Sequence, residues 1–172
     1  MSVGPPAGYI AALHGVVDQL TAPLEAAQAP HRVCARGCNA CCQDELTVFE
    51  VEAEHIQNTF AALLESEPPG PVGACAMLGA QGECRIYAAR PYVCRTQGLP
   101  LRWAELGPSG AAVERRDVCP KNDPGPGALE GLPAERCWSI GPVEARLQAA
   151  QALRGNGERI SIRTLFRARS SA

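Results

Sequence analysis

The feature that most constrains this chain is a run of cysteines, because four lie within nine residues, from Cys34 to Cys42. Thiols at this density either cross-link the chain or bind a soft metal. Four in nine residues are too many to be explained as small buried apolar side chains. The total of nine is odd, which fits poorly with a closed set of disulfides, so the sequence favours a metal site. The other cysteines are Cys75, Cys84, Cys94, Cys119 and Cys137.

Length and composition place the chain among ordinary globular domains. Its 172 residues suffice for one domain with its own core, and 46% apolar and 20% charged residues are usual for such a domain. The net charge of −2 creates no overall field that would attract nucleic acid or a membrane. The N-terminal region lacks the pattern of a secretory signal, and no apolar run reaches roughly 18 residues. We therefore expect a cytoplasmic location, where thiols stay reduced.

Three helices are predicted from apolar residues at helical spacing. The first covers residues 5–28, and the third covers residues 140–155. The second covers residues 48–65 and is opened by a capping box, in which Thr47 is the N-cap and Glu50 is the reciprocal partner.

The rest of the chain is predicted to form short elements and loops. Residues 83–87 are expected to form a brief strand, and residues 90–95 a single helical turn that begins at Pro91. A small hairpin is expected around the turn at residues 107–110, followed by an irregular loop at residues 119–136. The predicted fold is mainly α with irregular loops and a minor β hairpin, in one small domain organised around a Cys-ligated metal centre. The single domain covers residues 1–172. It contains the motif core 34–120, the helical segment 140–155 and a basic tail 156–172.

The spacing of the first cysteines suits a metal whose ligands must converge. Cys34, Cys38 and Cys41 are separated by three and two residues, and Gly37 lets the backbone turn between them. The N–H groups of such a loop can point at the sulfurs and stabilise the negative charge of a cluster. Cys42 directly follows Cys41, and neighbouring side chains diverge in extended backbone, so one of the two faces a second metal or is a spare thiol. A multinuclear centre accommodates this pair more easily than a single zinc ion.

The same spacing also matches the signature of radical S-adenosylmethionine enzymes, in which three cysteines leave one iron of a 4Fe–4S cluster open. Two features argue against this interpretation. Ala40 stands where those enzymes usually carry an aromatic residue, and the alternation of strands and helices in their barrel is absent.

A longer motif in the second half of the chain carries a family resemblance. The stretch from Cys84 to Arg95 reads Cys-Arg-Ile-Tyr-Ala-Ala-Arg-Pro-Tyr-Val-Cys-Arg. With the first four cysteines, Leu46-Thr47 and Cys75, it resembles the YkgJ-like cysteine-cluster family, also called CxxCxxCC proteins and described as zinc- or iron-chelating. The resemblance covers roughly residues 34–120 and implies a small metal-binding domain. The three-residue first gap and the extra Cys137 depart from the family pattern.

The predicted ligands come from both motifs. Three close cysteines with one remote cysteine are the commoner layout of an iron–sulfur site, whereas zinc sites usually pair two C-x2-C units. We therefore expect an iron–sulfur cluster, with zinc as the alternative and copper disfavoured because the chain has only two Met. We call residues 31–45, which carry the first four cysteines, the knuckle. Cys94 is the preferred remote partner of the knuckle, while Cys75 and Cys137 remain either ligands or buried thiols. The expected ligands are Cys34, Cys38, Cys41, Cys42, Cys84, Cys94 and Cys119.

Arg90, Arg95 and Tyr87 lie in the second motif and are expected around the centre. An all-thiolate cluster carries net negative charge, and nearby guanidiniums would offset it. The alternative is that both arginines pair with surface carboxylates and Tyr87 is a core residue. His14 and His55 are expected on helix surfaces.

Three functions remain open. The first is a metal-binding protein whose centre is structural or redox-active and serves a partner protein. The second is an enzyme that uses the centre in S-adenosylmethionine-linked methyl transfer or a redox step, as one relative by motif, the flagellin lysine methylase, suggests. No Gly-rich nucleotide loop, Ser–His–Asp pattern or HExxH motif supports it. The third is a nucleic-acid-binding module, whose only support is a group of arginines near the C-terminus. It is disfavoured because these arginines are explained more simply as a solvated basic tail. The arginines are Arg154, Arg159, Arg163, Arg167 and Arg169.

Overall fold

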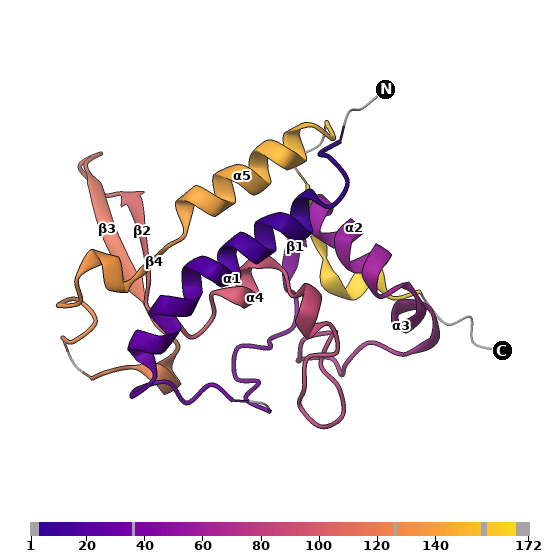
Figure 1. The fold of residues 1–172 in the computed structure, drawn as a ribbon, viewed down its shortest axis with the longest axis horizontal. Helices are drawn as coiled ribbons and strands as arrows, with labels where there is room; N and C mark the ends of the chain where they lie inside the picture. The colour runs from indigo at the N-terminus through magenta and orange to yellow at the C-terminus, as the bar shows by residue number, and fades with distance from the viewer. Residues whose placement is uncertain (1–3, 36, 126, 156–157, 168–172) are drawn as a thin grey trace.

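Five helices and five strands are seen in the structure, a computed structural model that describes residues 4–35, 37–125, 127–155 and 158–167. Figure 1 shows the β2–β3 hairpin at one end, α2 and α3 at the other, and α1 and α5 running between them. The helices are α1 (Tyr9–Gln28), α2 (Glu50–Thr59), α3 (Ala61–Ser66), α4 (Tyr92–Arg95) and α5 (Gly141–Ala152). The strands are β1 (Thr47–Phe49), β2 (Leu101–Leu106), β3 (Ala112–Asp117), β4 (Trp138–Ser139) and β5 (Arg159–Ser161). The domain is therefore small and mixed α/β, not mainly α with a single hairpin.

Two small sheets join distant parts of the chain. β2 and β3 form the antiparallel hairpin expected from the sequence, and β4 pairs in parallel with β2, with Trp138 opposite Leu101. β1 pairs antiparallel with β5, with Val48 opposite Ile160. Because β5 and the buried Ile162 come from the basic tail, the described part of that tail belongs to the fold.

The capping box expected at Thr47 does not form. Thr47 starts strand β1, and α2 begins at Glu50 after the extended Phe49, which makes no side-chain capping hydrogen bond. The single helix expected over residues 48–65 is divided at Phe60, whose φ of −125° is not helical. Pairing with the distant strand β5 explains the error, because tertiary contacts override local preferences.

Other local expectations are partly met. α1 begins at Tyr9, later than the preceding prolines suggested, since Gly8 adopts the left-handed φ of 78° just before it. Residues 83–87 form only an isolated bridge, between Cys84 and Leu78, instead of a strand. None of the described helices is both long enough and apolar enough to cross a bilayer.

Two apolar clusters fill the interior. The first, which we call the helical core, contains a chain of hydrogen bonds: Trp138 Nε1 donates to Tyr92 Oη at 2.8 Å, and this hydroxyl donates to the Ile140 carbonyl at 3.0 Å. The second, which we call the second core, has Cys75 in its interior and Cys42 and Cys84 packed against it. The helical core comprises Ile10, Leu13, Val17, Phe49, Val51, Tyr92, Leu99, Trp138, Val143, Leu147 and Ala150. The other members of the second core are Val48, Ala53, Ile56, Leu64, Ala76, Met77, Ile86, Ile162, Leu165 and Phe166.

A buried polar pair joins three of the helices. His14 on α1 is buried, contrary to the expected surface position, and its Nε2 lies 3.2 Å from Glu52 Oε1 on α2. The same carboxylate oxygen accepts a 2.7 Å hydrogen bond from the backbone N–H of Tyr92 on α4. This pair fixes the position of α4, the turn that also carries Cys94.

Candidate metal centre

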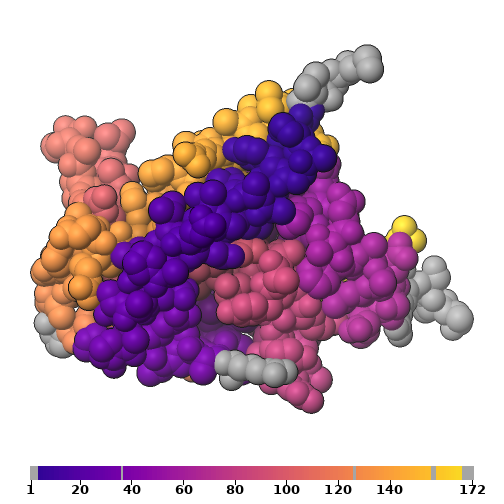
Figure 2. Space-filling view, in the orientation of Figure 1, coloured from indigo at the N-terminus to yellow at the C-terminus, as the bar shows by residue number. Residues whose placement is uncertain are grey.

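Eight of the nine cysteines line one cavity, which we call the thiol cavity. Its volume is about 870 Å³, and its wall combines the knuckle, the segment from Cys75 to Gly98, and Cys119. Figure 2 shows the molecule hollowed on this face, below α1 and between the knuckle and the segment that carries α4. Among the described residues that line it there is no histidine. The eight cysteines are Cys34, Cys38, Cys41, Cys42, Cys75, Cys84, Cys94 and Cys119.

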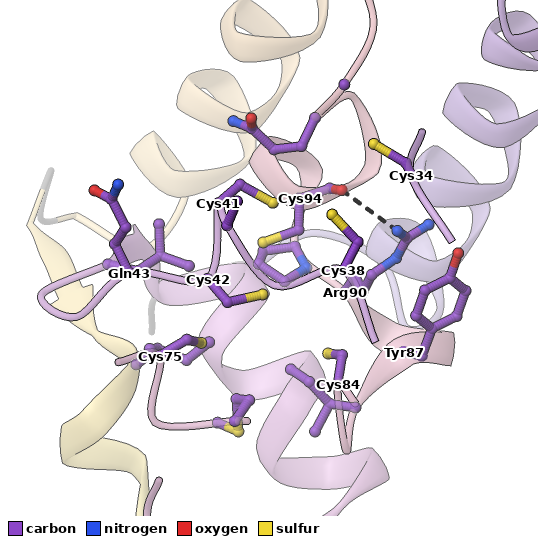
Figure 3. Close-up of a pocket in the computed structure, with 18 of the residues that line it drawn as sticks. Cys34, Cys38, Cys41, Cys42, Gln43, Cys75, Cys84, Tyr87, Arg90 and Cys94 are labelled. Atoms are coloured by element: carbon purple, nitrogen blue, oxygen red, sulfur yellow. Dashed lines mark hydrogen bonds between the residues drawn. The ribbon is translucent and has the colours of Figure 1, made fainter. Parts of the chain in front are cut away.

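The thiols face one another across the cavity without touching a common point. Figure 3 shows the sulfurs of Cys38, Cys41, Cys42 and Cys94 turned toward the middle of the space. All nine cysteines are free thiols. In the described segments, no three His, Cys, Asp or Glu side chains are arranged to hold a metal ion directly. A bound metal would therefore have to draw the surrounding loops inward.

The knuckle is built from two tight turns. The N–H groups of Cys38 and Cys42 each donate to the carbonyl three residues earlier, both at 2.9 Å. Gly37 has a φ of 88°, which other residues adopt only with strain. These turns expose Cys41 and leave Cys42 half-buried, so the two neighbouring thiols lie in different surroundings.

Four cysteines form the inner wall of the cavity. Cys75 is buried, and its N–H donates to the Cys42 carbonyl at 2.9 Å. Cys84 is held by its bridge to Leu78, while Cys94 projects from α4. We call Cys42, Cys75, Cys84 and Cys94 the inner group.

Burial keeps the thiols of Cys42 and Cys94 protonated when no metal is bound. Burial is the main reason that the pKa of Cys42 is raised to about 12, and the thiols of Cys41, Cys75 and Cys84 contribute to the increase. Burial likewise raises the pKa of Cys94, with the thiols of Cys75, Cys84 and Cys42 adding to the effect. Metals bind thiolates, so binding at this wall must release protons, and the cation must supply the charge that compensates the thiolates.

Asn122 organises the opposite side of the cavity. This buried side chain donates through Nδ2 to Cys34 Sγ at 3.2 Å and to the Gly98 carbonyl at 2.8 Å, while Oδ1 accepts from the Val33 N–H at 3.0 Å. Its own backbone N–H donates to the Cys119 carbonyl at 2.7 Å. A Cβ on Gly98 would lie 2.8 Å from the Cys34 sulfur, so only glycine fits there. Sequence analysis missed Asn122, because a single asparagine so far from Cys34 carries no local signal.

The remaining cavity thiols are near Asn122 or in the knuckle. Burial raises the pKa of Cys41, and the thiols of Cys119 and Cys34 add to the effect. Cys38 closes the first of the two turns of the knuckle and faces the same space (Figure 3). We call Cys34, Cys38, Cys41 and Cys119 the outer group.

Arg90 and Tyr87 line the thiol cavity, whereas Arg95 does not. The Arg90 guanidinium lies 3.9 Å from the centre of the Tyr87 ring and donates to the Cys94 carbonyl at 3.5 Å (Figure 3). Tyr87 is 61% exposed and thus is not a core residue. Arg95 is buried and donates to Asp18 at 2.6 Å and to two carbonyls of its own motif, which fastens α4 to α1. Arg90 is therefore placed to offset the charge of a thiolate cluster, while Arg95 has a structural role.

Cys137 lies apart from the thiol cavity. It is buried to the same degree as Cys75, with exposed fractions of 6% and 8%. Its charged neighbours are Arg116 and Glu114 on the hairpin, and it does not line the cavity. The two cysteines therefore share burial and differ in access to the other thiols.

The arginines of the basic tail bind groups of the protein itself. Arg163 donates to Asp44 at 2.9 Å and to three backbone carbonyls in residues 70–74, so it clamps the segment that leads into Cys75. Arg169 lies outside the described residues. Arg154, just after α5, and the tail residues Arg159 and Arg167 each have a side-chain partner as well.

A small mixed domain whose cavity is lined by eight thiols belongs to the class of soft-metal-binding proteins. The family model CxxCxxCC, described as "Putative zinc- or iron-chelating domain", matches residues 33–119, half of the chain. The protein belongs to this family, which confirms the resemblance seen in its motifs. No curated protein and no solved structure matches the chain. The family region ends at Cys119, so Asn122 lies just beyond it.

Proposed function

We propose that this protein binds an iron–sulfur cofactor in the thiol cavity. The cofactor would have a structural or electron-transfer role that serves a partner protein. The observation that carries the proposal is the gathering of eight thiols around a cavity of about 870 Å³. A single zinc ion, with Zn–S distances of about 2.3 Å, needs four thiolates and a small part of that space. Iron–sulfur clusters are larger and are held by Cys thiolates. The proposed ligands are the seven cysteines expected from the sequence together with Cys75.

The chain's own residues supply the surroundings that such a cofactor requires. Arg90 brings positive charge to the wall beside Cys94, and the Asn122 amide donates a hydrogen bond to the Cys34 sulfur. Both interactions stabilise the anionic form of a cluster and raise its reduction potential. The second core shields the inner wall from water, which also tunes the potential.

Anaerobic purification with measurement of iron, acid-labile sulfide and zinc tests this proposal. We expect a brown protein with a visible absorption band and with iron and sulfide in equal amounts. Colourless protein with stoichiometric zinc would overturn the iron–sulfur assignment and leave a zinc-chelating domain. Protein that binds neither metal after reconstitution would overturn metal binding altogether.

The size of the cavity supports one alternative, an enzyme that uses the centre. About 870 Å³ lies within the range of roughly 300–1,000 Å³ that is usual for small-molecule sites. Arg90 and Arg159 in its lining could bind an anionic group of a co-substrate. Such an enzyme would catalyse methyl transfer linked to S-adenosylmethionine, or a redox step. Calorimetric titration of the metal-loaded protein with S-adenosylmethionine tests it, and no measurable binding would remove methyl transfer.

A further inference from the structure

The cavity thiols divide into two groups that are supported by different parts of the fold. From this division we infer, on the basis of the metal-binding function proposed above, that the protein holds two separate four-thiolate metal centres. The inner group of Cys42, Cys75, Cys84 and Cys94 forms one centre. The outer group of Cys34, Cys38, Cys41 and Cys119 forms the other.

Three of the four inner-group cysteines belong to the second core or pack against it. Cys75 is a buried member of that core, and Cys42 and Cys84 pack directly against it. The Cys75 N–H to Cys42 carbonyl bond joins two of these ligand segments, and the clamp of Arg163 on residues 70–74 holds the approach to Cys75. These contacts place the sulfurs of Cys42, Cys75 and Cys84 in surroundings with low access to water, and Cys94 lines the same cavity from α4. They also make Cys75 a ligand, although sequence analysis left its role open.

The outer group is organised by Asn122. Its side chain donates to the Cys34 sulfur, and its backbone N–H donates to the Cys119 carbonyl three residues earlier, so Asn122 ties the Cys34 segment to the turn that follows Cys119. Gly98 permits this approach because a Cβ would collide with both the Cys34 sulfur and the Asn122 amide, at 2.8 and 2.9 Å. The outer centre is nearer to solvent, since Cys41 is exposed.

The adjacent pair Cys41 and Cys42 supports such a division. The turn closed by the hydrogen bond from the Cys42 N–H to the Asn39 carbonyl leaves Cys41 exposed and Cys42 half-buried. The thiols of Cys41 and Cys42 neighbour each other, but their other thiol neighbours differ: these are Cys119 and Cys34 for Cys41, and Cys75 and Cys84 for Cys42. With their Cα atoms about 3.8 Å apart, the two residues would make the centres close neighbours. Two sets of four also account for the odd count of nine cysteines, because Cys137 lies outside the cavity.

Metal content of serine variants tests the inference. We expect Cys75→Ser to lose the inner centre and Cys119→Ser to lose the outer one, so that each retains about half of the metal of the unchanged protein. Cys137→Ser is the matched control: it alters an equally buried thiol and should retain all of the metal. Complete loss in either single variant, or full retention in Cys75→Ser, would show that the thiols do not form two independent centres.

Stepwise chelation of the unchanged protein gives a second test that does not depend on how the variants fold. A chelator is added in portions, newly released thiols are alkylated, and the modified cysteines are mapped by mass spectrometry. We expect two phases, with the outer-group cysteines labelled before those of the inner group. Simultaneous labelling of all eight would overturn the inference. Two phases with zinc as the released metal would overturn only the iron–sulfur assignment, and absence of metal would overturn both.

Discussion

The helical core and the thiol cavity are stabilised in different ways. Leu147 and Val17 in the helical core are fully buried, and the polar atoms of Tyr92 and Trp138 are satisfied by each other. The thiol cavity is walled by short turns and by thiols that face open space. Apolar burial stabilises the first region without any ligand, whereas metal binding would cross-link the short loops of the second.

The two regions meet at α4. Tyr92 on this turn packs in the helical core, and Cys94 on the same turn lines the thiol cavity. Glu52 and Asp18 fasten the turn to α2 and α1 through hydrogen bonds to Tyr92 and Arg95. The helical core thus positions the Cys94 thiol, one of the proposed ligands.

Metal removal should separate the two regions most clearly. We expect chelation to speed amide exchange most in residues 31–35 and 37–45, because few of their N–H groups donate to backbone carbonyls. Amides of α5 should keep their protection, since the helical core does not depend on metal. Hydrogen–deuterium exchange with mass spectrometry measures both regions in one sample. Equal loss of protection in α5 and in the loops would contradict the comparison.

Truncation of Leu147 probes the helical core directly. Leu147→Ala should lower the free energy of unfolding by about 2–5 kcal/mol, because it creates a cavity at a fully buried site. The loss should be the same with and without metal, and the metal content per folded molecule should not change. Leu153→Ala, at the exposed end of the same helix, is the control with little expected effect. A fall in metal content would mean that the two regions are not independent.

Asn122 probes the cavity side. Asn122→Asp preserves the shape of the side chain but replaces the donor facing the Cys34 sulfur with an acceptor or a negative charge. We expect the affinity of the outer centre for metal to fall about 10–100-fold, as is typical when a residue that supports a ligand is changed. Competition with a chromophoric chelator measures the change. Asn58→Asp on the exposed face of α2 adds the same charge elsewhere. An equal fall in metal affinity in this variant would show that Asn122 does not support the outer centre.

A substitution in the β2–β3 hairpin should have the smallest effect on stability, and this effect should depend on pH. Hydrogen bonds from Arg116 first, and then from Arg102, lower the pKa of Glu114 below its ordinary 4.5. Glu114 therefore stabilises the folded state above its ordinary pKa, and this contribution is lost as the pH falls through the lowered value. Glu114→Gln should slightly lower Tm at neutral pH, with the difference shrinking below pH 4.5. Thermal melts across this range check the trend, and a constant difference would refute the assignment.

Local patterns were sufficient for several elements. The hairpin, the helical turn after Pro91 and α5 were predicted correctly, because each depends on neighbouring residues alone. The capping box at Thr47 failed because its backbone pairs with β5, more than a hundred residues along the chain. The surface position expected for His14 failed because Glu52 supplies a buried partner on another helix.

By itself, the sequence determined that this protein carries a thiolate site for soft metals. Close cysteine spacing and the glycine between them act over a few residues, so they are visible without a fold, and the family match agrees. Only the tertiary structure decided which thiols share a wall. Cys75 meets Cys42, and Asn122 meets Cys34, through contacts between segments that the chain brings together only when it closes around its two cores. Side-chain proximity of that kind follows from packing, and no local pattern encodes it.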